Sequence, residues 1–346
     1  MIAEHVTPPE FLQFPYLQAS WVQVVVALVV AAVLGVVVRA LGPRIGALDH
    51  PDAELKPHGR AVSYLGGLAV ACGLAAGIAT RGWPLRVSAT IALFGPVVLG
   101  LADDALRVPP VVRLAVQVAF AVVLALGLTS DTTDPQALSV AVAYAVFYVA
   151  AMNAVNMVDG MDGLAGTLAV LSAAGIAVVA LTVTDRHPAL VAVCLAAAVA
   201  GFLVHNLPPA RLFLGDNGAY LIGAGLSVAA FQAGDSVPTL AGASGCLGMF
   251  LLDLLLSVLR RITGRMPLHR GDRSHLYDQL RARGRSVWGT IAVCAGAQLA
   301  FVIAGVVAAQ LSTPGALAVQ GVVWAAAVGA LFAFGFVSYR RPAKVR

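Results

Sequence analysis

The chain has 346 residues, of which 60% are hydrophobic and 11% are charged, and its formal net charge is +5. Because soluble globular proteins carry about 25% charged residues, this composition excludes a soluble domain and indicates a membrane protein. The four cysteines stand singly in apolar segments, which excludes a disulfide framework and a cysteine metal site. The first twenty residues contain no Lys or Arg, so we expect no cleaved signal peptide.

Apolar runs long enough to cross a bilayer recur along the whole sequence. They predict an all-α, polytopic membrane protein with a single transmembrane domain over residues 1–346, and no fixed-period repeat is visible. We predict about eleven spans from hydropathy. They cover residues 21–41, 61–80, 87–102, 111–129, 137–153, 164–184, 188–204, 218–233, 239–258, 287–310 and 315–337.

The basic residues predict how these spans are oriented. If the N-terminus lies outside, only Arg81, Arg86 and Arg186 fall in outer segments, and every other Lys and Arg falls in an inner one. Positive residues concentrate on the cytoplasmic side, so we expect an outer N-terminus and a cytoplasmic C-terminus in the plasma membrane. This bias accounts for the net charge without a nucleic-acid partner. It also predicts cytoplasmic polar loops at 42–60, 103–113, 153–163, 205–217 and 259–286.

The first acidic cluster is Asp103-Asp104, at the end of the third span. Adjacent carboxylates repel each other, and the macrodipole disfavours negative charge at the C-terminal end of a helix. A metal ion, a proton or a cationic substrate would relieve the repulsion. A solvated helix end is the alternative, and we rank it below a functional pair.

The densest cluster is NAVNMVDGMDGL, over residues 153–164. Two amides, Asn153 and Asn156, and two carboxylates, Asp159 and Asp162, follow one another at steps of three. A continuous helix would spread these groups over opposite faces, but the glycine after each acid lets the chain turn and gather them. Such oxygen ligands suit Mg²⁺. The alternative is a polar turn with a helix cap.

Two further cytoplasmic segments carry candidate site residues. The run HNLPPARLFLGDNG, over 205–218, offers Asp216 as a metal ligand and Phe213 as a stacking platform for a base, although a helix cap and a packing residue are the plainer interpretations. In the basic loop 259–286, Arg273 and His275 suit phosphate binding, while most of the other arginines fit a solvated loop. Asp253 is an intramembrane acid, ranked lower because it could pair with a neighbouring helix.

These motifs carry a family resemblance. The pattern NxxNxxDGxDGLA from Asn153 to Ala165, the Asp103-Asp104 pair and the FxGD element ending at Asp216 stand here in the order that the polyprenyl-phosphate N-acetylhexosamine-1-phosphate transferases show. A basic residue and a histidine ahead of Gly66-Gly67 also match. The chain resembles this superfamily over about residues 40–285. The superfamily includes the undecaprenyl-phosphate GlcNAc-1-phosphate and phospho-N-acetylmuramoyl-pentapeptide transferases.

The resemblance implies transfer of a sugar-1-phosphate from a UDP-sugar to a polyprenyl phosphate, with Mg²⁺ (or Mn²⁺) as cofactor and UMP as product, at the start of a lipid-linked cell-envelope glycan. The attack would be direct or would pass through an aspartyl-phosphate. The implied catalytic residues are Asp103, Asp104, Asp162 and His275, and the implied metal ligands are Asp216 and Asp104. The implied substrate-binding residues are Lys56, His58, Asn156, Asp159, Asn206, Phe213 and Arg273.

Two smaller features of the sequence distinguish between the donor branches of the family. After His275 the sequence reads Leu276-Tyr277-Asp278, so it keeps only the first histidine of the family's histidine-rich loop. Eleven spans also resemble the GlcNAc branch, whereas the pentapeptide branch has ten. We therefore favour an N-acetylhexosamine donor, with the pentapeptide transferase as the alternative.

Rivals from other classes fit less well. An ion-coupled secondary transporter would place its acids near the midplane, a CDP-alcohol phosphotransferase would need a different pattern around Asp162-Gly163, and a scaffold would not need these acids. A homodimer through the last two spans is left open.

Overall fold

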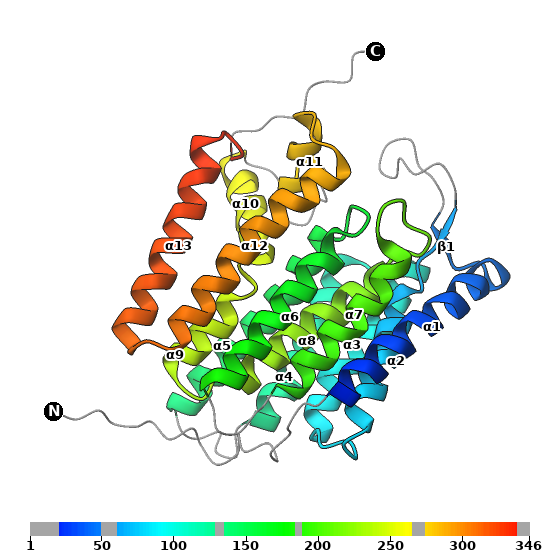
Figure 1. The fold of residues 1–346 in the computed structure, drawn as a ribbon, viewed down its shortest axis with the longest axis horizontal. Helices are drawn as coiled ribbons and strands as arrows, with labels where there is room; N and C mark the ends of the chain where they lie inside the picture. The colour runs from blue at the N-terminus through cyan, green and yellow to red at the C-terminus, as the bar shows by residue number, and fades with distance from the viewer. Residues whose placement is uncertain (1–20, 50–60, 129–134, 184–188, 265–273, 338–346) are drawn as a thin grey trace.

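The computed structural model describes residues 21–49, 61–128, 135–183, 189–264 and 274–337. Within these residues the chain forms a helical bundle with one short antiparallel strand pair (Figure 1), so the predicted all-α fold is confirmed. The elements are α1 (Trp21–Ile45), β1 (Leu48–Asp49), β2 (Val62–Ser63), α2 (Gly66–Ala79), α3 (Val87–Leu106), α4 (Pro110–Leu128), α5 (Pro135–Val158), α6 (Leu164–Val183), α7 (Leu190–Asn206), α8 (Gly215–Ala233), α9 (Val237–Gly245), α10 (Gly248–Thr263), α11 (Leu276–Ala282), α12 (Val287–Ala309) and α13 (Thr313–Ala333).

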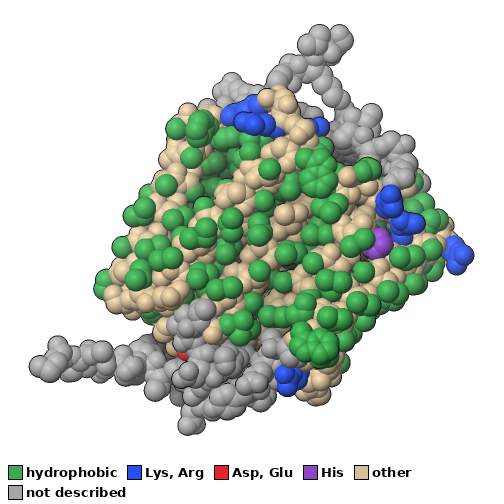
Figure 2. Space-filling view, in the orientation of Figure 1, with side chains coloured by type: hydrophobic (Ala, Val, Ile, Leu, Met, Phe, Trp, Pro, Cys, Tyr) green, Lys and Arg blue, Asp and Glu red, His purple; other side chains and the backbone are tan. Residues whose placement is uncertain are grey.

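These helices support a polytopic membrane protein. In the described residues, 7 helices are long and apolar enough to cross a bilayer, or up to 8 if the bent pair α9 and α10 is one span. Helices α2 and α7 are apolar but shorter. Hydrophobic side chains cover the flank of the molecule formed by α1, α6, α12 and α13 (Figure 2), as lipid contact requires. Each of the eleven predicted segments falls on a helix or helix pair, but the number of complete crossings and their orientation remain predictions.

The ninth predicted span, 239–258, is broken in the structure. Helices α9 and α10 meet at 72°, and the break leaves main-chain groups without partners inside either helix. The buried side chain of Gln298, from α12, supplies the partners: its amide donates to the Cys246 carbonyl at 2.5 Å, and its oxygen accepts from the Met249 N–H at 3.1 Å. Satisfying such groups is what makes irregular backbone tolerable at membrane depth.

Helix α8 is the centre of the bundle. Almost every residue from Asn217 to Ala233 is buried, against α3, α5, α6 and α2. Two glycines permit the closest approaches, because a Cβ at Gly67 would lie 2.1 Å from Asn217 Oδ1 and one at Gly100 would lie 2.2 Å from Asn217 Cα. The first turn of α8 is therefore held between the main chains of α2 and α3.

The described parts of the segments predicted to face the cytoplasm lie at one end of the bundle (upper right in Figure 1). There the strand pair joins the turn before α8, since the Phe213 N–H donates to the Ser63 carbonyl at 2.9 Å and the Gly66 N–H to the Phe213 carbonyl at 3.0 Å. These bonds explain why residues 62–65 are extended or turning and α2 begins only at Gly66, later than the predicted span. The described chain begins at the opposite end and finishes at this one, as an odd number of crossings would require.

Candidate active site

Asp104, near the end of α3, accepts hydrogen bonds from the first turn of α8. Its Oδ1 accepts from the Asp216 N–H at 3.0 Å, and its Oδ2 accepts from the Asn217 N–H at 3.2 Å and the Asn217 side-chain amide at 2.7 Å. The first N–H groups of a helix lack partners within it and attract negative charge. Asp104 therefore caps α8 from a neighbouring helix and fixes the main chain that carries Asp216.

Asp103 is buried next to Asp104 but has different partners. Its Oδ2 accepts from the Arg113 guanidinium at 3.0 Å and from the Tyr220 hydroxyl at 2.8 Å. Within the described residues its Oδ1 has no hydrogen-bond partner. One oxygen is thus fixed by α4 and α8, and the other can meet a substrate. Arg113 brings a guanidinium, the side chain best suited to phosphate, to the same place.

Asp216 and Asp159 lie at the centre of the acidic cluster. The Asn156 side-chain amide donates to Asp216 Oδ1 at 2.5 Å. Burial raises the pKa of Asp159 well above its ordinary value, and the negative charges of Asp216, Asp104 and Asp162 raise it further. These four carboxylates therefore lie within electrostatic reach of one another. Such a concentration of negative charge favours binding of a cation.

The glycine-containing turn between α5 and α6 is tied to the segment before α8. Asp162 Oδ2 accepts from the Ala210 N–H at 2.9 Å. Asn206 bridges the two segments, since its oxygen accepts from the Gly163 N–H at 3.0 Å and its amide donates to the Leu212 carbonyl at 2.9 Å. Gly163 has a positive φ of 73°, which favours glycine. Asp162 and Asn206 thus shape the site through main-chain contacts.

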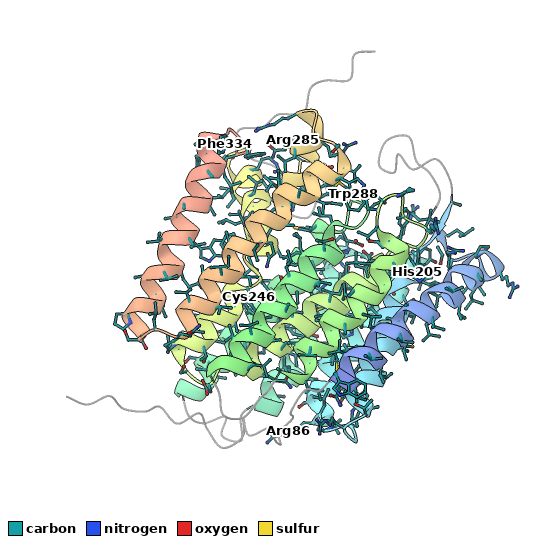
Figure 3. The ribbon with its side chains drawn as sticks, viewed as in Figure 1. Arg86, His205, Cys246, Arg285, Trp288 and Phe334 are labelled. Carbon is teal, nitrogen blue, oxygen red and sulfur yellow. The ribbon has the colours of Figure 1, made fainter. Side chains whose placement is uncertain are left out.

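Phe213 lies within this second segment, and its main chain is fixed by β2 and α2 as described above. Its side chain is half-buried, and its stacking role stays a prediction. The neighbouring histidine, His205, is at the same end of the bundle (Figure 3), but its Nε2 lies 2.8 Å from the Ala32 carbonyl of α1, which is a packing role. Three predicted substrate-binding residues lie outside the described residues: Lys56, His58 and Arg273.

His275 precedes α11 and is paired with an acid on α10. Its Nδ1 lies 2.7 Å from Asp253 Oδ2, and the Leu276 N–H donates to Asp253 Oδ1 at 2.7 Å. Ser257, one turn further along α10, places its hydroxyl 3.2 Å from the same ring nitrogen. Both His275 and Asp253 are buried. A carboxylate at Nδ1 fixes the tautomer and orientation of an imidazole, so that Nε2 is the atom presented to other groups.

A second ring connects His275 with the acidic cluster. The rings of His275 and Tyr277 are parallel within 3°, with centroids 5.8 Å apart. A Cβ at Gly160 would lie 1.9 Å from the Tyr277 hydroxyl oxygen, so that hydroxyl packs directly on the main chain of the turn between Asp159 and Asp162. The structure therefore brings α11 up to the carboxylates, although the two are far apart in sequence.

The acidic cluster fits a divalent cation that is held partly by substrate. Among the described residues, no three His, Cys, Asp or Glu side chains are placed to hold a metal ion by themselves. Mg²⁺ commonly binds through one or two carboxylates together with water and substrate phosphates. Asp216 and Asp159 lie within electrostatic reach of each other and supply hard oxygen ligands. The residues present thus match this mode of binding.

Four residues of the site were missed or ranked low in the sequence. Tyr220 stands one helical turn after Asp216, so the i, i+4 rule would have placed both on one face of α8. Asp253 was ranked low, yet the structure makes it the partner of His275. Arg113 belongs to no motif, and Tyr277 is a departure from the family's histidine-rich loop; the packing of α4 and α11 brings both to the site.

The amino-acid sequence is similar to that of known transferases over most of its length. The model of glycosyl transferase family 4 matches residues 86–234. A protein of Streptomyces coelicolor that is named as a glycosyltransferase is 32% identical to this chain, over 95% of this chain and 79% of its own length. The undecaprenyl-phosphate alpha-N-acetylglucosaminyl 1-phosphate transferase of Thermotoga maritima is 30% identical, over 75% of this chain and 80% of its own.

A third relative comes from the other branch. The phospho-N-acetylmuramoyl-pentapeptide-transferase of Picosynechococcus is 32% identical, over 62% of this chain and 66% of its own. These similarities extend well beyond the short motifs, and they confirm the resemblance that the motifs carry. The chain belongs to glycosyl transferase family 4 and is a membrane-embedded transferase.

Proposed function

We propose that this protein transfers N-acetylhexosamine-1-phosphate from a UDP-sugar to a polyprenyl phosphate at the cytoplasmic face of the plasma membrane and releases UMP. The gathering of Asp103, Asp104, Asp159 and Asp216 with Arg113 at one end of a membrane bundle carries the proposal. The name of the Thermotoga relative, an undecaprenyl-phosphate N-acetylglucosaminyl 1-phosphate transferase, supports this substrate class. The product would begin a lipid-linked glycan.

The reaction is a phosphoryl transfer in which one P–O bond forms and another breaks. An oxygen of the polyprenyl phosphate attacks the β-phosphorus of the donor, and the bond from that phosphorus to the bridging oxygen breaks, so that UMP leaves with the bridging oxygen. Such transfers need positioning and charge neutralisation more than covalent help. Near neutral pH a phosphate monoester is already mostly dianionic. Direct attack is therefore our preferred route over an aspartyl-phosphate intermediate.

The acids divide into ligands and positioning groups. Mg²⁺, when bound, would neutralise charge on the donor diphosphate, and Mn²⁺ could replace it. Asp216 and Asp159 are proposed to hold the metal. Asp104, predicted as a second ligand, uses both oxygens on the first turn of α8, which argues that it mainly fixes Asp216. Asp103, with one oxygen bound by Arg113, would orient the acceptor phosphate and take a proton from any monoanion.

The remaining predicted residues surround the donor in this proposal. Asn156 orients Asp216, while Asp162 and Asn206 shape the nucleotide side of the site through the two tied segments. Phe213 would stack on uracil. His275, oriented by Asp253, would donate a hydrogen bond to a phosphate oxygen. Lys56, His58 and Arg273 keep their predicted phosphate and substrate contacts.

UMP release by the purified protein tests the proposal, with Mg²⁺, undecaprenyl phosphate and a panel of UDP-sugars. We expect lipid-dependent UMP from a UDP-N-acetylhexosamine, and its loss when Mg²⁺ is chelated. Asp216→Asn and Asp103→Asn should each abolish turnover while the protein stays monodisperse. Near-normal turnover in either folded variant would contradict the assigned role. The panel includes UDP-N-acetylmuramoyl-pentapeptide, because the Picosynechococcus relative favours that donor as the second candidate.

A further inference from the structure

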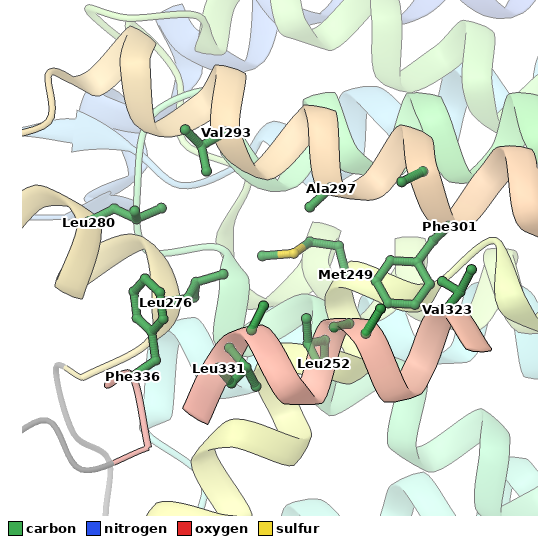
Figure 4. Close-up of a pocket in the computed structure, with 14 residues that line it drawn as sticks. Met249, Leu252, Leu276, Leu280, Val293, Ala297, Phe301, Val323, Leu331 and Phe336 are labelled. Atoms are coloured by element: carbon green, nitrogen blue, oxygen red, sulfur yellow. The ribbon is translucent and has the colours of Figure 1, made fainter. Parts of the chain in front are cut away.

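An apolar cavity lies on the side of α10 that faces α12 and α13 (Figure 4). Its volume is about 350 Å³. Four helices contribute side chains, and every lining residue is hydrophobic; six of them are Met249, Leu252, Leu280, Ala297, Ala327 and Phe336. Water needs several polar partners in such a space, and the lining offers none from its side chains. Hydrocarbon is therefore the occupant that the lining favours.

The cavity reaches the flank of the bundle that lipid would cover. Val293 of α12, which lines it, exposes 41% of its surface. Outside the cavity, α13 is mostly exposed and α12 exposes Leu299, Ile303 and Val307, and both helices are long and apolar enough to span a membrane. An acyl chain from the surrounding bilayer can thus enter sideways.

Three exposed arginines stand at one end of this cavity: Arg281 and Arg283 at the end of α11, and Arg285 before α12. The Arg283 guanidinium lies 4.1 Å from the ring centre of Phe336, a lining residue, and donates to the Phe334 carbonyl at 2.9 Å. Arg281 donates to the main-chain carbonyl of Arg285. Within the described residues none of the three is paired with a carboxylate.

The rim has the other features of a membrane–water boundary. The exposed rings of Trp288, three residues after Arg285, and of Phe334, whose carbonyl accepts from Arg283, lie at the same end of the molecule as Arg285 in Figure 3. Aromatic side chains gather at the headgroup level of membrane proteins. Basic pockets between membrane helices on the cytoplasmic side bind anionic headgroups. The apolar cavity thus matches an acyl chain, the arginines match a phosphate, and the aromatic residues mark the interface beside it.

We propose that the cavity and its arginine rim bind an anionic phospholipid of the bilayer, with one acyl chain against α10 and α13 and the phosphate at Arg281 and Arg285. Arg283 anchors the rim to α13. This site is separate from the acceptor site, because the acceptor phosphate must reach the carboxylates, whereas this cavity leads to arginines.

A lipid bound at this site would affect the active site through α11. Leu276 and Leu280 line the cavity from one face of that short helix. Adjacent residues His275 and Tyr277 contact Asp253 and the turn at Gly160. A filled cavity holds Leu276 and Leu280 in place and therefore steadies the two rings beside the active site.

Lipid binding to the full-length protein tests this, measured by native mass spectrometry and by thermal shift with phosphatidylglycerol or phosphatidylcholine. We expect preference for phosphatidylglycerol. Arg281→Gln and Arg285→Gln should each weaken it by about fivefold, the factor for a charge contact worth about 1 kcal/mol. The matched control is Arg86→Gln, because Arg86 is also exposed and also donates to a main-chain carbonyl, but at the opposite end of the bundle (Figure 3).

A second pair of variants tests the cavity itself. Ala327→Phe fills the space and should reduce binding of both phospholipids, whereas Ala325→Phe, on the exposed face of the same helix, should not. Equal binding of the two phospholipids by the native protein would overturn the proposal, as would equal losses in the control variants. If undecaprenyl phosphate displaces phosphatidylglycerol and Ala327→Phe raises the KM for undecaprenyl phosphate, the site belongs to the acceptor and the proposal is wrong.

Discussion

Replacing Asp253 by Asn isolates the contribution of the Asp253–His275 pair. The native carboxylate accepts two hydrogen bonds of 2.7 Å, one from the ring nitrogen of His275 and one from the Leu276 N–H. Asparagine has a single side-chain acceptor, so one of these two donors would face the NH₂ group and lose its bond. The site is buried, and water cannot replace the lost partner easily.

The expected cost follows from the kind of bond that is lost. A hydrogen bond to a charged group contributes about 1.5–3 kcal/mol, and each 1.4 kcal/mol corresponds to about a factor of ten. If the oriented imidazole acts mainly in the transition state, Asp253→Asn should lower kcat by about 10- to 100-fold. The KM for the UDP-sugar should change little, since the Asp253–His275 contact orients the imidazole and does not itself bind the nucleotide.

UMP release gives kcat and KM for Asp253→Asn, His275→Ala and the double variant. The double variant should be no slower than His275→Ala alone, because Asp253 acts through the ring. Ser257→Ala serves as the matched control, since it removes a longer, 3.2 Å contact to the same nitrogen and should cost less. Additive losses in the double variant, or an unchanged kcat in a folded Asp253→Asn protein, would refute the positioning role.

Three further predictions concern the packing that supports the site. Gly160→Ala puts a Cβ 1.9 Å from the Tyr277 hydroxyl, so turnover should fall and should be partly restored by adding Tyr277→Phe. Asp104→Ala removes the cap of α8, which should cost about 0.5–2 kcal/mol and appear as a lower Tm together with lost activity. An unchanged Tm would contradict the capping role. Gln298→Leu leaves the main-chain groups at the break between α9 and α10 without hydrogen-bond partners, so the free energy of unfolding should fall by about 1–3 kcal/mol in thermal unfolding. Gln298→Glu should show a smaller fall, because it keeps an acceptor for the Met249 N–H.

The helices were predictable because the length of an apolar run almost fixes whether it becomes a membrane helix. The break in the ninth span was not predictable, since no proline marks it and the partner that stabilises it, Gln298, comes from α12. The late start of α2 also depends on a distant segment, because Ser63 and Gly66 bond to the main chain of Phe213. Tertiary contacts decide both features.

The candidate site was predictable where local spacing concentrates acids and amides, as from Asn153 to Asp162. The contacts between clusters were not. Asp104 bonds to α8 across more than a hundred residues, and Asp253 pairs with His275, 22 residues later in the sequence. The sequence therefore predicted the clustered acids and amides, whereas the structure adds Arg113, Tyr220 and Tyr277 and shows which groups hold the others in place.

The acids of the site differ in their hydrogen-bond partners. Asp104 accepts hydrogen bonds from the first turn of α8, and Asp103 accepts from Arg113 and Tyr220. Asp162 accepts from a main-chain N–H. Asp159 has no such donor among the described residues, and its raised pKa reflects the burial and neighbouring charge that it meets. A carboxylate in that position gains most from a cation, because a proton or a metal ion relieves both costs. We therefore expect Asp159→Asn to raise the Mg²⁺ concentration needed for half-maximal turnover. Asp162→Asn should mainly disturb the tied segments and lower turnover at every Mg²⁺ concentration, so a Mg²⁺ titration of turnover distinguishes the two variants.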